Sequence, residues 1–300
     1  MEKPYLLHFA TPAARVSPFD VNMAYDAGWN AVIPYAGVGL ADIAGFTQDA
    51  IFSRGPKGVK RTGIFIGGRD AVLATDMLDA ARKAMVPPFE VSVFADPSGA
   101  YTTAAAMVAK VEQSLRRTHG AGLEGRTVVV FGGTGPVGMV AAVLAARAGA
   151  RVTLPGHDGL ARAAEAVSAL KARFDVDIQP ADASSDDAKH ALLAPAEVVL
   201  ATAKAGVQVL GAAHLRHAPA LCVAADINAV PPAGIEGIGF MDDGSALTAA
   251  SGKAVGVGPL AIGNLKYQVQ QGLLRRMLST DKPLYLGFPE CLDEARQHAA

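Results

Sequence analysis

The chain has 300 residues, a length that can bury a large core and usually divides into two domains. Its residues are 51% apolar and 18% charged and include 32 glycines, which is typical of a compact α/β protein and argues against disorder. The 27 basic and 28 acidic residues give a formal charge of −1, so bulk electrostatics favour neither nucleic acid nor an anionic membrane as a partner.

Cysteine usage and the hydropathy pattern point to a soluble protein. Two cysteines, Cys222 and Cys291, are too few for a disulfide framework or a CxxC metal site, so we expect the protein to be located in the reducing cytoplasm. The first residues lack a basic segment followed by an apolar segment of the usual length, so no secretory signal is expected. Residues 127–146 are uncharged, but their glycines and Pro136 favour a strand, a turn and a helix over a membrane span.

Strands and helices alternate along the first part of the chain, which predicts a smaller α/β domain over residues 1–122. The expected strands are 31–36, 62–68 and 89–96, and the expected helices are 69–85 and 102–118. Glycine-rich residues 119–125 indicate a linker.

The second part alternates more regularly and predicts a doubly wound parallel sheet of the Rossmann type over residues 123–265. The expected strands are 126–131, 150–154, 176–182, 196–203, 220–227 and a short one near Ile238, and the expected helices are 136–148, 160–174 and 185–193. A further helix is expected over 259–278, and the C-terminal segment 266–300 is expected to pack back on the first domain.

A glycine-rich turn joins the strand at 126–131 to the following helix. Its sequence is Gly133-Thr134-Gly135-Pro136-Val137-Gly138, which fits G-x-G-x-x-G. The three glycines allow a tight turn, the approach of a pyrophosphate to the backbone, and close contact between helix and strand. The strand–turn–helix context predicts dinucleotide binding at the positive end of the helix.

The acidic residue that commonly binds the adenosine ribose is missing after the second strand of this unit. That strand ends in Leu154, Pro155 and Gly156, and His157 and Asp158 follow. Without the acid the 2′-phosphate of NADP is not repelled, so both NADP and NAD are expected as cofactors. His157 can donate to the phosphate and Asp158 can reach a ribose hydroxyl, although an ordinary loop histidine explains His157 equally well.

Motifs at six separate places together resemble one family over essentially the whole chain. They lie at residues 17–29, 47–68, 94–111, 131–150, 225–238 and 252–267. In these segments the sequence resembles the methylene-tetrahydromethanopterin dehydrogenases of methylotrophic bacteria, and most of all the form that uses both NAD and NADP. An Arg tends to follow the glycine after the second strand in the strictly NADP-using relatives, and His157 stands there instead.

The resemblance implies hydride transfer from the methylene bridge of methylene-tetrahydromethanopterin to NAD(P), a step in formaldehyde oxidation. Because the bridge carbon lies between two nitrogens, loss of hydride gives a stabilised cation and requires no proton abstraction at that carbon. Catalysis is therefore expected to rest on positioning and water exclusion. The resemblance also implies a homo-oligomer, a trimer or hexamer.

Polar residues of the first domain are candidates for contact with the pterin. Asp20, in an expected loop beside an apparently buried Phe19, is a candidate for favouring the developing cation, and Asn22 for hydrogen bonding. "SPFD" suits a helix cap equally well. Asp96, Ser98 and Thr102 lie where a strand turns into a helix, at a ligand-facing position that capping would also explain.

The remaining candidates come from the second domain and its C-terminal neighbour. Lys253, in a glycine-rich run, is a candidate catalytic cation, and Lys266 a candidate substrate contact. Ala203, Asp226 and Asn228 follow predicted core strands and are candidates for the cofactor side. His214 and His217 lack neighbouring ligands, so no metal is expected.

Two other functions remain compatible with the residues. A methylene-tetrahydrofolate dehydrogenase would use the same bridge chemistry on the same architecture. A regulator would bind NADP without turnover. Conversion of the pterin substrate distinguishes the three.

Overall fold

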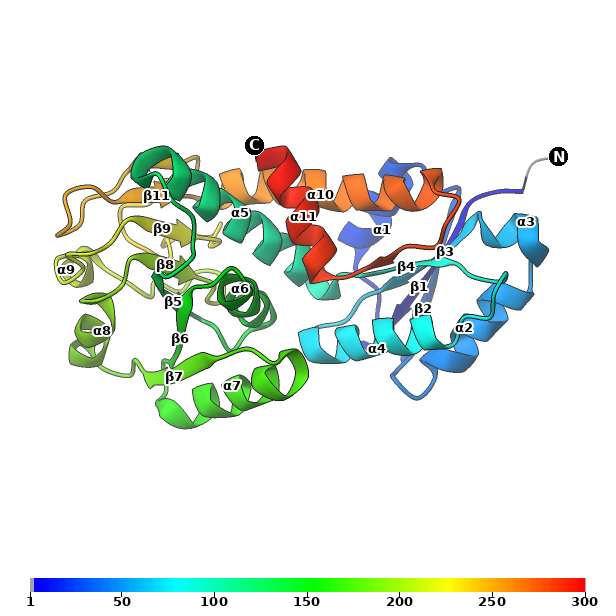
Figure 1. The fold of residues 1–300 in the computed structure, drawn as a ribbon, viewed down its shortest axis with the longest axis horizontal. Helices are drawn as coiled ribbons and strands as arrows, with labels where there is room; N and C mark the ends of the chain where they lie inside the picture. Colours follow the sequence, from blue (N-terminus) through cyan, green and yellow to red (C-terminus); the bar gives the residue numbers. More distant parts are fainter. Residues whose placement is uncertain (1–2, 300) are drawn as a thin grey trace. The chain divides into compact units, whose positions relative to one another are not determined.

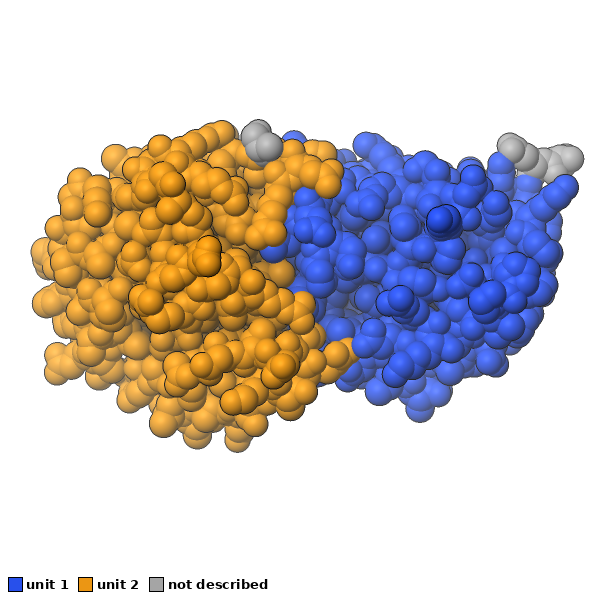
Figure 2. Space-filling model, viewed as in Figure 1, with its two compact units in different colours: residues 1–102, 267–294 blue, residues 103–266, 295–300 orange. Residues whose placement is uncertain are grey.

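The structure is a computed structural model that describes residues 3–299. Its internal contacts divide the chain into two compact units, coloured separately in Figure 2. Unit 1 comprises the chain up to Thr102 together with Tyr267–Glu294, and unit 2 comprises Thr103–Lys266 together with the residues from Ala295 onward. These limits lie inside three helices and not at 119–125.

Unit 1 is built on a five-stranded parallel sheet in the order β12-β4-β3-β1-β2 (Figure 1). The strands are β1 (Leu6–Thr11), β2 (Ala31–Ala36), β3 (Thr62–Ile66), β4 (Ser92–Ala95) and β12 (Tyr285–Leu286), and the helices are α1 (Pro18–Ala27), α2 (Ile43–Phe52), α3 (Gly55–Val59) and α4 (Ala71–Lys83). Counted from β2 the order reverses between β1 and β3. In open α/β sheets such a reversal opens a crevice at the edge where the strands end, the carboxyl edge.

Three phenylalanines form the centre of the unit 1 core. Phe9 of β1 is paired in register with Phe65 of β3, which is paired with Phe94 of β4. Their rings meet edge to face with centroids 4.8 and 5.3 Å apart, and each is almost fully buried. This geometry suits the aromatic quadrupole, so the row fixes the register of the three strands.

Unit 2 is built on a seven-stranded sheet in the order β10-β11-β9-β8-β5-β6-β7, parallel except for β10. The strands are β5 (Thr127–Phe131), β6 (Arg151–Gly156), β7 (Ile178–Asp182), β8 (Val198–Ala201), β9 (Val223–Asp226), β10 (Asp243–Ala246) and β11 (Val255–Val257), and the helices are α6 (Pro136–Arg147), α7 (Leu160–Phe174), α8 (Asp186–Leu193) and α9 (Ala212–Leu215). From β7 to β11 this is the strand order of a Rossmann sheet, and the predicted doubly wound fold is confirmed.

Three further helices contain the limits between the units: α5 (Ala100–His119), α10 (Pro259–Ser279) and α11 (Phe288–Ala299). The predicted helices at 102–118 and 259–278 correspond to α5 and α10. None of the helices that the structure describes is both apolar enough and long enough to cross a bilayer.

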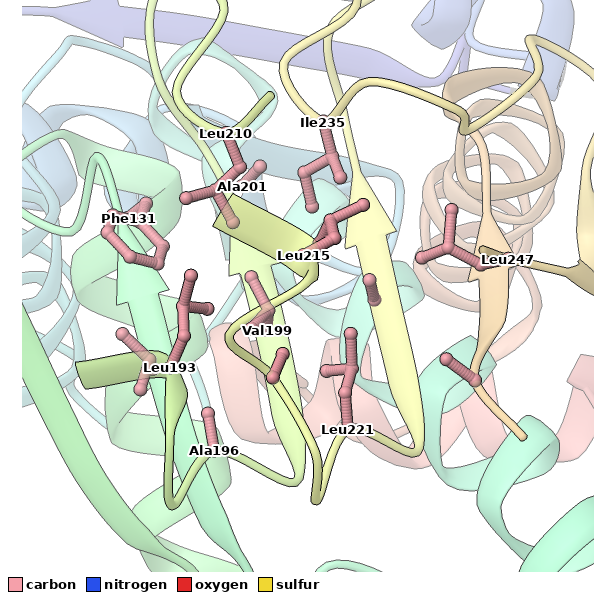
Figure 3. Packing of buried hydrophobic residues seen from close by; sticks show 14 of the residues in the cluster. Phe131, Leu193, Ala196, Val199, Ala201, Leu210, Leu215, Leu221, Ile235 and Leu247 are labelled. Atoms are coloured by element: carbon pink, nitrogen blue, oxygen red, sulfur yellow. The ribbon is translucent and has the colours of Figure 1, made fainter. Parts of the chain in front are cut away.

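One core cluster of unit 2 lies on the side of the sheet where α8 and α9 run (Figure 3). It joins Phe131 at the end of β5 with Val199 of β8, Leu215 of α9 and the loop residues Leu210 and Ile235. All five are at least 96% buried. Burying an aliphatic or aromatic side chain of this size contributes about 1.5–3 kcal/mol, so the cluster holds the ends of β5, β8 and β9 together.

Some predicted elements were wrong or missing. No strand forms at Ile238; two short strands, β10 and β11, form after it. The glycine-rich run around Lys253 was not predicted as a strand, yet β11 pairs with β9 immediately after it. Residues 18–27, which were expected to be a loop, form α1 with Ser17 as its N-cap.

Both long edge strands contain a proline. Pro34 lies within β2 and Pro180 within β7. Proline has no N–H to donate to a further strand, so it is tolerated at a sheet edge and discourages pairing with another chain.

A buried ion pair joins α5 to α11 within unit 2. Arg296 donates from Nε and Nη2 to the two carboxylate oxygens of Glu112 at 2.8 and 2.7 Å, and the Glu112 side chain is only 4% exposed. Replacing Arg296 by Met leaves this carboxylate with Arg116 at 3.4 Å as its remaining ion-pair partner. We expect a loss of about 2 kcal/mol in unfolding free energy, measured by urea denaturation.

The exposed pair Lys60–Asp281 provides the control, since its side chains are 56% and 90% exposed. Lys60→Met is expected to cost less than about 1 kcal/mol. Equal losses from the two substitutions would show that burial of Glu112 does not matter.

Candidate functional site

The glycine-rich turn of unit 2 lies at the carboxyl edge, between β5 and α6. Gly132, directly after β5, has φ +76° and its carbonyl accepts from Gly135 N at 3.1 Å. The left-handed residue of the turn is thus Gly132, one position before the predicted motif. Gly135 is the N-cap of α6 and Pro136 its first residue, where the missing N–H costs nothing.

The glycines of the turn differ in the contacts that a Cβ atom would make if one were added. At Gly133 a Cβ would lie 2.5 Å from Leu154 Cγ, and at Gly138 it would lie 2.5 Å from Thr202 Oγ1 and 2.6 Å from Gly133 Cα. Both glycines therefore allow close packing. At Gly135 a Cβ would meet only Gly132 O within 4 Å, at 3.4 Å, so this position is not closely packed.

A helix N-terminus preceded by such a cradle fits the pyrophosphate of a dinucleotide, because free N–H groups and the positive end of the helix dipole point at it. Thr134, Gly135, Pro136 and Val137 are all partly exposed, so the turn is open to solvent. The residues that would hold the pyrophosphate are therefore those of the predicted motif, with Gly132 added.

The end of β6 is tightly folded. Leu154, Pro155 and Gly156 are buried, and an added Cβ at Gly156 would lie 2.1 Å from Gly159 O. His157 and Asp158 follow with side chains 81% and 49% exposed, and His157 Nδ1 lies 3.8 Å from Asp158 Oδ1. Both side chains are available to a ligand at this edge.

The loops after β8 and β9 are held together by two buried side chains. Asp226 Oδ1 accepts from Asn228 N at 2.9 Å and Oδ2 from Ile235 N at 3.0 Å. Burial raises the pKa of Asp226, and these backbone donors together with the N–H of Gly234 offset part of the rise.

Asn228 extends this network across the two loops. Its Oδ1 accepts from Gly206 N and Val230 N at 3.0 Å each, and its Nδ2 donates to Pro232 O at 2.8 Å. Ala203, which is partly exposed, follows β8 and lies against Gly132, where an added Cβ would be 2.5 Å from Ala203 N. These loops lie beside the turn on the side away from β6, and the side chains of Asp226 and Asn228 bind to their backbone.

Lys253 lies at the opposite edge of the same sheet. It precedes β11, whose first residue pairs with the first residue of β9, so it stands where the parallel strands begin. There it contributes with Arg126 to lowering the pKa of His119, after the larger effect of burial. The glycine turn lies a strand length away, about 13 Å for four residues. This position does not favour the predicted catalytic role.

In unit 1 the first turn of α1 brings a carboxylate into the interior. Ser17 Oγ accepts from Asp20 N at 3.4 Å as the cap, and Asp20 is only 4% exposed. Gln270 Nε2 of α10 donates to Asp20 Oδ1 at 2.7 Å. Phe19 is 50% exposed, so the expectation that it is buried was wrong: the two neighbours have the opposite orientation.

The other two polar candidates near this helix differ in burial. Asn22 is exposed on α1 and can reach a ligand directly. Lys266 is 8% exposed and lies one turn before Gln270 on the same face of α10.

The turn after β4 combines capping with backbone strain. Asp96 is fully buried; Oδ1 accepts from Tyr101 N and Thr102 N, and Oδ2 from Thr102 Oγ1 at 2.7 Å. Ser98 has φ +53° and its exposed side chain donates to Gly68 O at 2.7 Å. A non-glycine residue in this conformation costs about 1–3 kcal/mol and often marks a ligand site. Of these candidates Ser98 is therefore free to meet a ligand, whereas Asp96 and Thr102 support its turn.

Metal binding finds no support in the part of the chain that the structure describes: no group of three or more His, Cys, Asp or Glu side chains there is arranged to hold an ion. His214 Nε2 instead lies 2.9 Å from Asp186 Oδ1, and the rings of His190 and His217 stack with centroids 3.7 Å apart.

Comparison with known proteins decides the family. A profile described as "Methylene-tetrahydromethanopterin dehydrogenase, N-terminal" matches residues 18–98. The NAD(P)-dependent methylenetetrahydromethanopterin dehydrogenase of Methylorubrum extorquens is 49% identical, over 94% of this chain and 95% of the relative. The chain belongs to the NAD(P)-dependent methylenetetrahydromethanopterin dehydrogenase family.

One further relative and one solved structure are also similar to this chain. The bifunctional protein MdtA of the same organism is 32% identical over 95% of this chain and 96% of the relative. Among solved structures, the NAD-dependent malic enzyme of Thermotoga maritima superposes with a TM-score of 0.57 at 12% identity, covering 98% of this chain and 84% of that one. At that identity the likeness shows the fold alone.

The switch point of the unit 1 sheet in this dehydrogenase brings together four residues that the sequence did not single out as site candidates. The switch point between β1 and β3 places Thr11 and Pro12 beside Gly67 and Gly68, and Gly67 N donates to Ala10 O at 2.9 Å. An added Cβ at Gly67 would lie 2.6 Å from the Phe9 ring. The signal was the Gly-Gly pair directly after an apolar strand.

Proposed function

We propose that this chain transfers a hydride from the methylene bridge of methylene-tetrahydromethanopterin to NAD⁺ or NADP⁺, giving the methenyl form. The observation that carries the proposal is the whole-length similarity to a relative of that name, with an intact glycine cradle at the expected edge of unit 2. When bound, the nicotinamide supplies the hydride acceptor.

The residues of unit 2 hold the cofactor in this proposal. Gly132 to Val137 bind the pyrophosphate at the start of α6. Asn228 and Asp226 fix the loops after β8 and β9, and the exposed Val207 and Val230 of these loops present apolar surface that excludes water from the nicotinamide side.

The residues of unit 1 bind the pterin in this proposal. Phe19, Asn22 and Ser98 have exposed side chains and make direct contacts, while Asp96 and Thr102 hold the turn that presents Ser98. Asp20, fixed by Gln270, places negative charge near the cation that forms as hydride leaves. Lys266, the last residue of the unit 2 part of α10, is retained as a substrate contact, and Lys253 is omitted because of its position.

Asp20→Asn tests the electrostatic part of the proposal. We expect kcat/KM for the pterin to fall about 100-fold, because Asn keeps an oxygen for Gln270 and loses the negative charge. Asp26→Asn, on the exposed side of the same helix, is the matched control. Equal activity in the two variants would remove Asp20 from the mechanism.

The function itself is tested by mixing the purified protein with methylene-tetrahydromethanopterin and either NAD⁺ or NADP⁺, and following reduced nicotinamide by its near-ultraviolet absorbance. Turnover with both is the expected result. Activity only with methylene-tetrahydrofolate would reassign the enzyme, and cofactor binding without turnover of either substrate would leave a regulator.

We further propose a cytoplasmic homo-oligomer, a trimer or hexamer. Support comes from exposed apolar side chains, among them Phe240 at 47% and Met241 at 70% exposure, which a subunit interface would cover. Sedimentation velocity measures the assembly, and a monomer at all concentrations would contradict it.

A further inference from the structure

The missing acid after β6 has a steric cause. Gly156 ends the strand, and any Cβ there would lie 2.1 Å from Gly159 O, well inside van der Waals contact. No side chain, and hence no carboxylate, fits at this position without rebuilding the loop. Charge discrimination at the adenosine ribose must therefore come from a neighbouring position.

Besides Asp158 on the loop after β6, the structure contains a second exposed carboxylate at this edge, on the next strand. Asp182 ends β7 and is the register partner of Gly156 in the parallel pair β6–β7. The pairing continues past the strand end, since Ala183 N donates to Gly156 O at 2.8 Å. Neighbouring strands lie about 4.8 Å apart, so Asp182 stands one strand spacing from the place of the missing acid.

The Asp182 side chain is held in place and is open to solvent. Its Oδ1 accepts from Ser184 N at 2.8 Å, closing a turn of the kind that Asp and Asn both form. The hydrogen bonds from Ser184 lower the pKa of Asp182, so the exposed side chain is a carboxylate at neutral pH.

We propose that Asp182 is the residue that sets the balance between NAD and NADP in this enzyme, by repelling the 2′-phosphate from the neighbouring strand. The inference rests on the proposed dinucleotide site. The adenosine half of a dinucleotide runs from the glycine turn over the ends of the next two strands, here β6 and β7. This half therefore ends beside Asp182.

The displaced position predicts that NADP binding is weakened and not abolished. An acid on β6 would grip both ribose hydroxyls, whereas a carboxylate one strand away acts through charge across solvent and is screened by salt. His157, 81% exposed on the adjacent loop, supplies a donor that partly offsets the repulsion.

The test compares binding of ADP-ribose and 2′-phospho-ADP-ribose to the full-length protein by titration calorimetry, with no substrate present. In Asp182→Asn the ratio of their dissociation constants is expected to shift about fivefold in favour of the phosphorylated probe. Asn preserves the turn with Ser184, so the fold is retained. The shift should shrink in high salt, which a purely structural effect would not do.

Asp177→Asn is the matched control. Asp177 is also exposed and lies just before β7, so it removes the same charge at the opposite edge of the sheet. An unchanged ratio in Asp182→Asn, or an equal shift in Asp177→Asn, overturns the assignment while the dehydrogenase proposal stands. Failure of the unaltered protein to bind either probe overturns both.

Discussion

Gly135→Ala is expected to weaken dinucleotide binding strongly while leaving the fold intact. The added Cβ meets only Gly132 O at 3.4 Å, and the φ of −85° suits any residue. The added methyl group takes up space at the turn itself, where a pyrophosphate needs direct contact with backbone N–H groups. We expect NADH affinity to fall about 100-fold, measured by fluorescence titration, with a stability cost of about 1 kcal/mol for a poorer N-cap.

Two other glycine substitutions are the controls for Gly135→Ala. Gly138→Ala places a Cβ 2.5 Å from Thr202 Oγ1 and is expected to lower both stability and affinity, because α6 must move away from the sheet. Gly45→Ala, in α2 with nothing within 4 Å of the new Cβ, is expected to change neither affinity nor fold. Full NADH affinity in Gly135→Ala would show that the cradle does not hold the pyrophosphate.

The sequence predicted the elements whose pattern is local. Residues 126–131 form an apolar strand directly before a glycine turn and a Pro-started helix, and the structure has β5 and α6 there. The conformation of such segments can be predicted from their own residues, because β-propensity, turn residues and capping residues are local features. The alternation of strands with helices predicted the doubly wound fold class, but not the order of the strands or the last two of them.

Elements defined by distant partners escaped prediction. β11 has three residues in a glycine-rich run and is a strand only because β9 and β10 pair with it. The edge position of Lys253 follows from that pairing, so no local pattern revealed it. In α1, the orientation of Phe19 and Asp20 is set by packing against α10, about 250 residues away in sequence.

The candidate site shows the same division between local and distant information. The glycine turn was predicted from the spacing of its glycines, because the turn and the close packing around it require glycine at fixed positions along the chain. Asp182 was not found, since its relation to Gly156 is a register between two strands and is not visible along the chain. A polar residue that completes a site from a neighbouring strand requires the sheet order first.

Asp226→Asn is expected to lower the unfolding free energy by about 2–3 kcal/mol and to loosen the loops after β8 and β9. The two carboxylate oxygens accept from Asn228 N and Ile235 N, and an amide offers only one oxygen. Its NH₂ group would face a buried N–H donor, leaving both without an acceptor. Urea denaturation measures the loss, and NADH affinity is expected to fall while ADP-ribose affinity holds, because only the nicotinamide side is affected.

The pH dependence of this loss has a defined sign. Burial raises the pKa of Asp226 in the folded protein above its unfolded value, so the carboxyl group contributes most to stability when protonated, and that contribution is lost as pH rises through the folded pKa. The variant lacks this titration, so its deficit is expected to widen as the pH falls from neutral toward ~4. Asp242→Asn is the control, since Asp242 Oδ2 accepts from Gly239 N at 2.6 Å and Asn keeps that bond. A deficit that narrowed in acid would mean that the three backbone donors outweigh burial and hold the Asp226 carboxyl ionised.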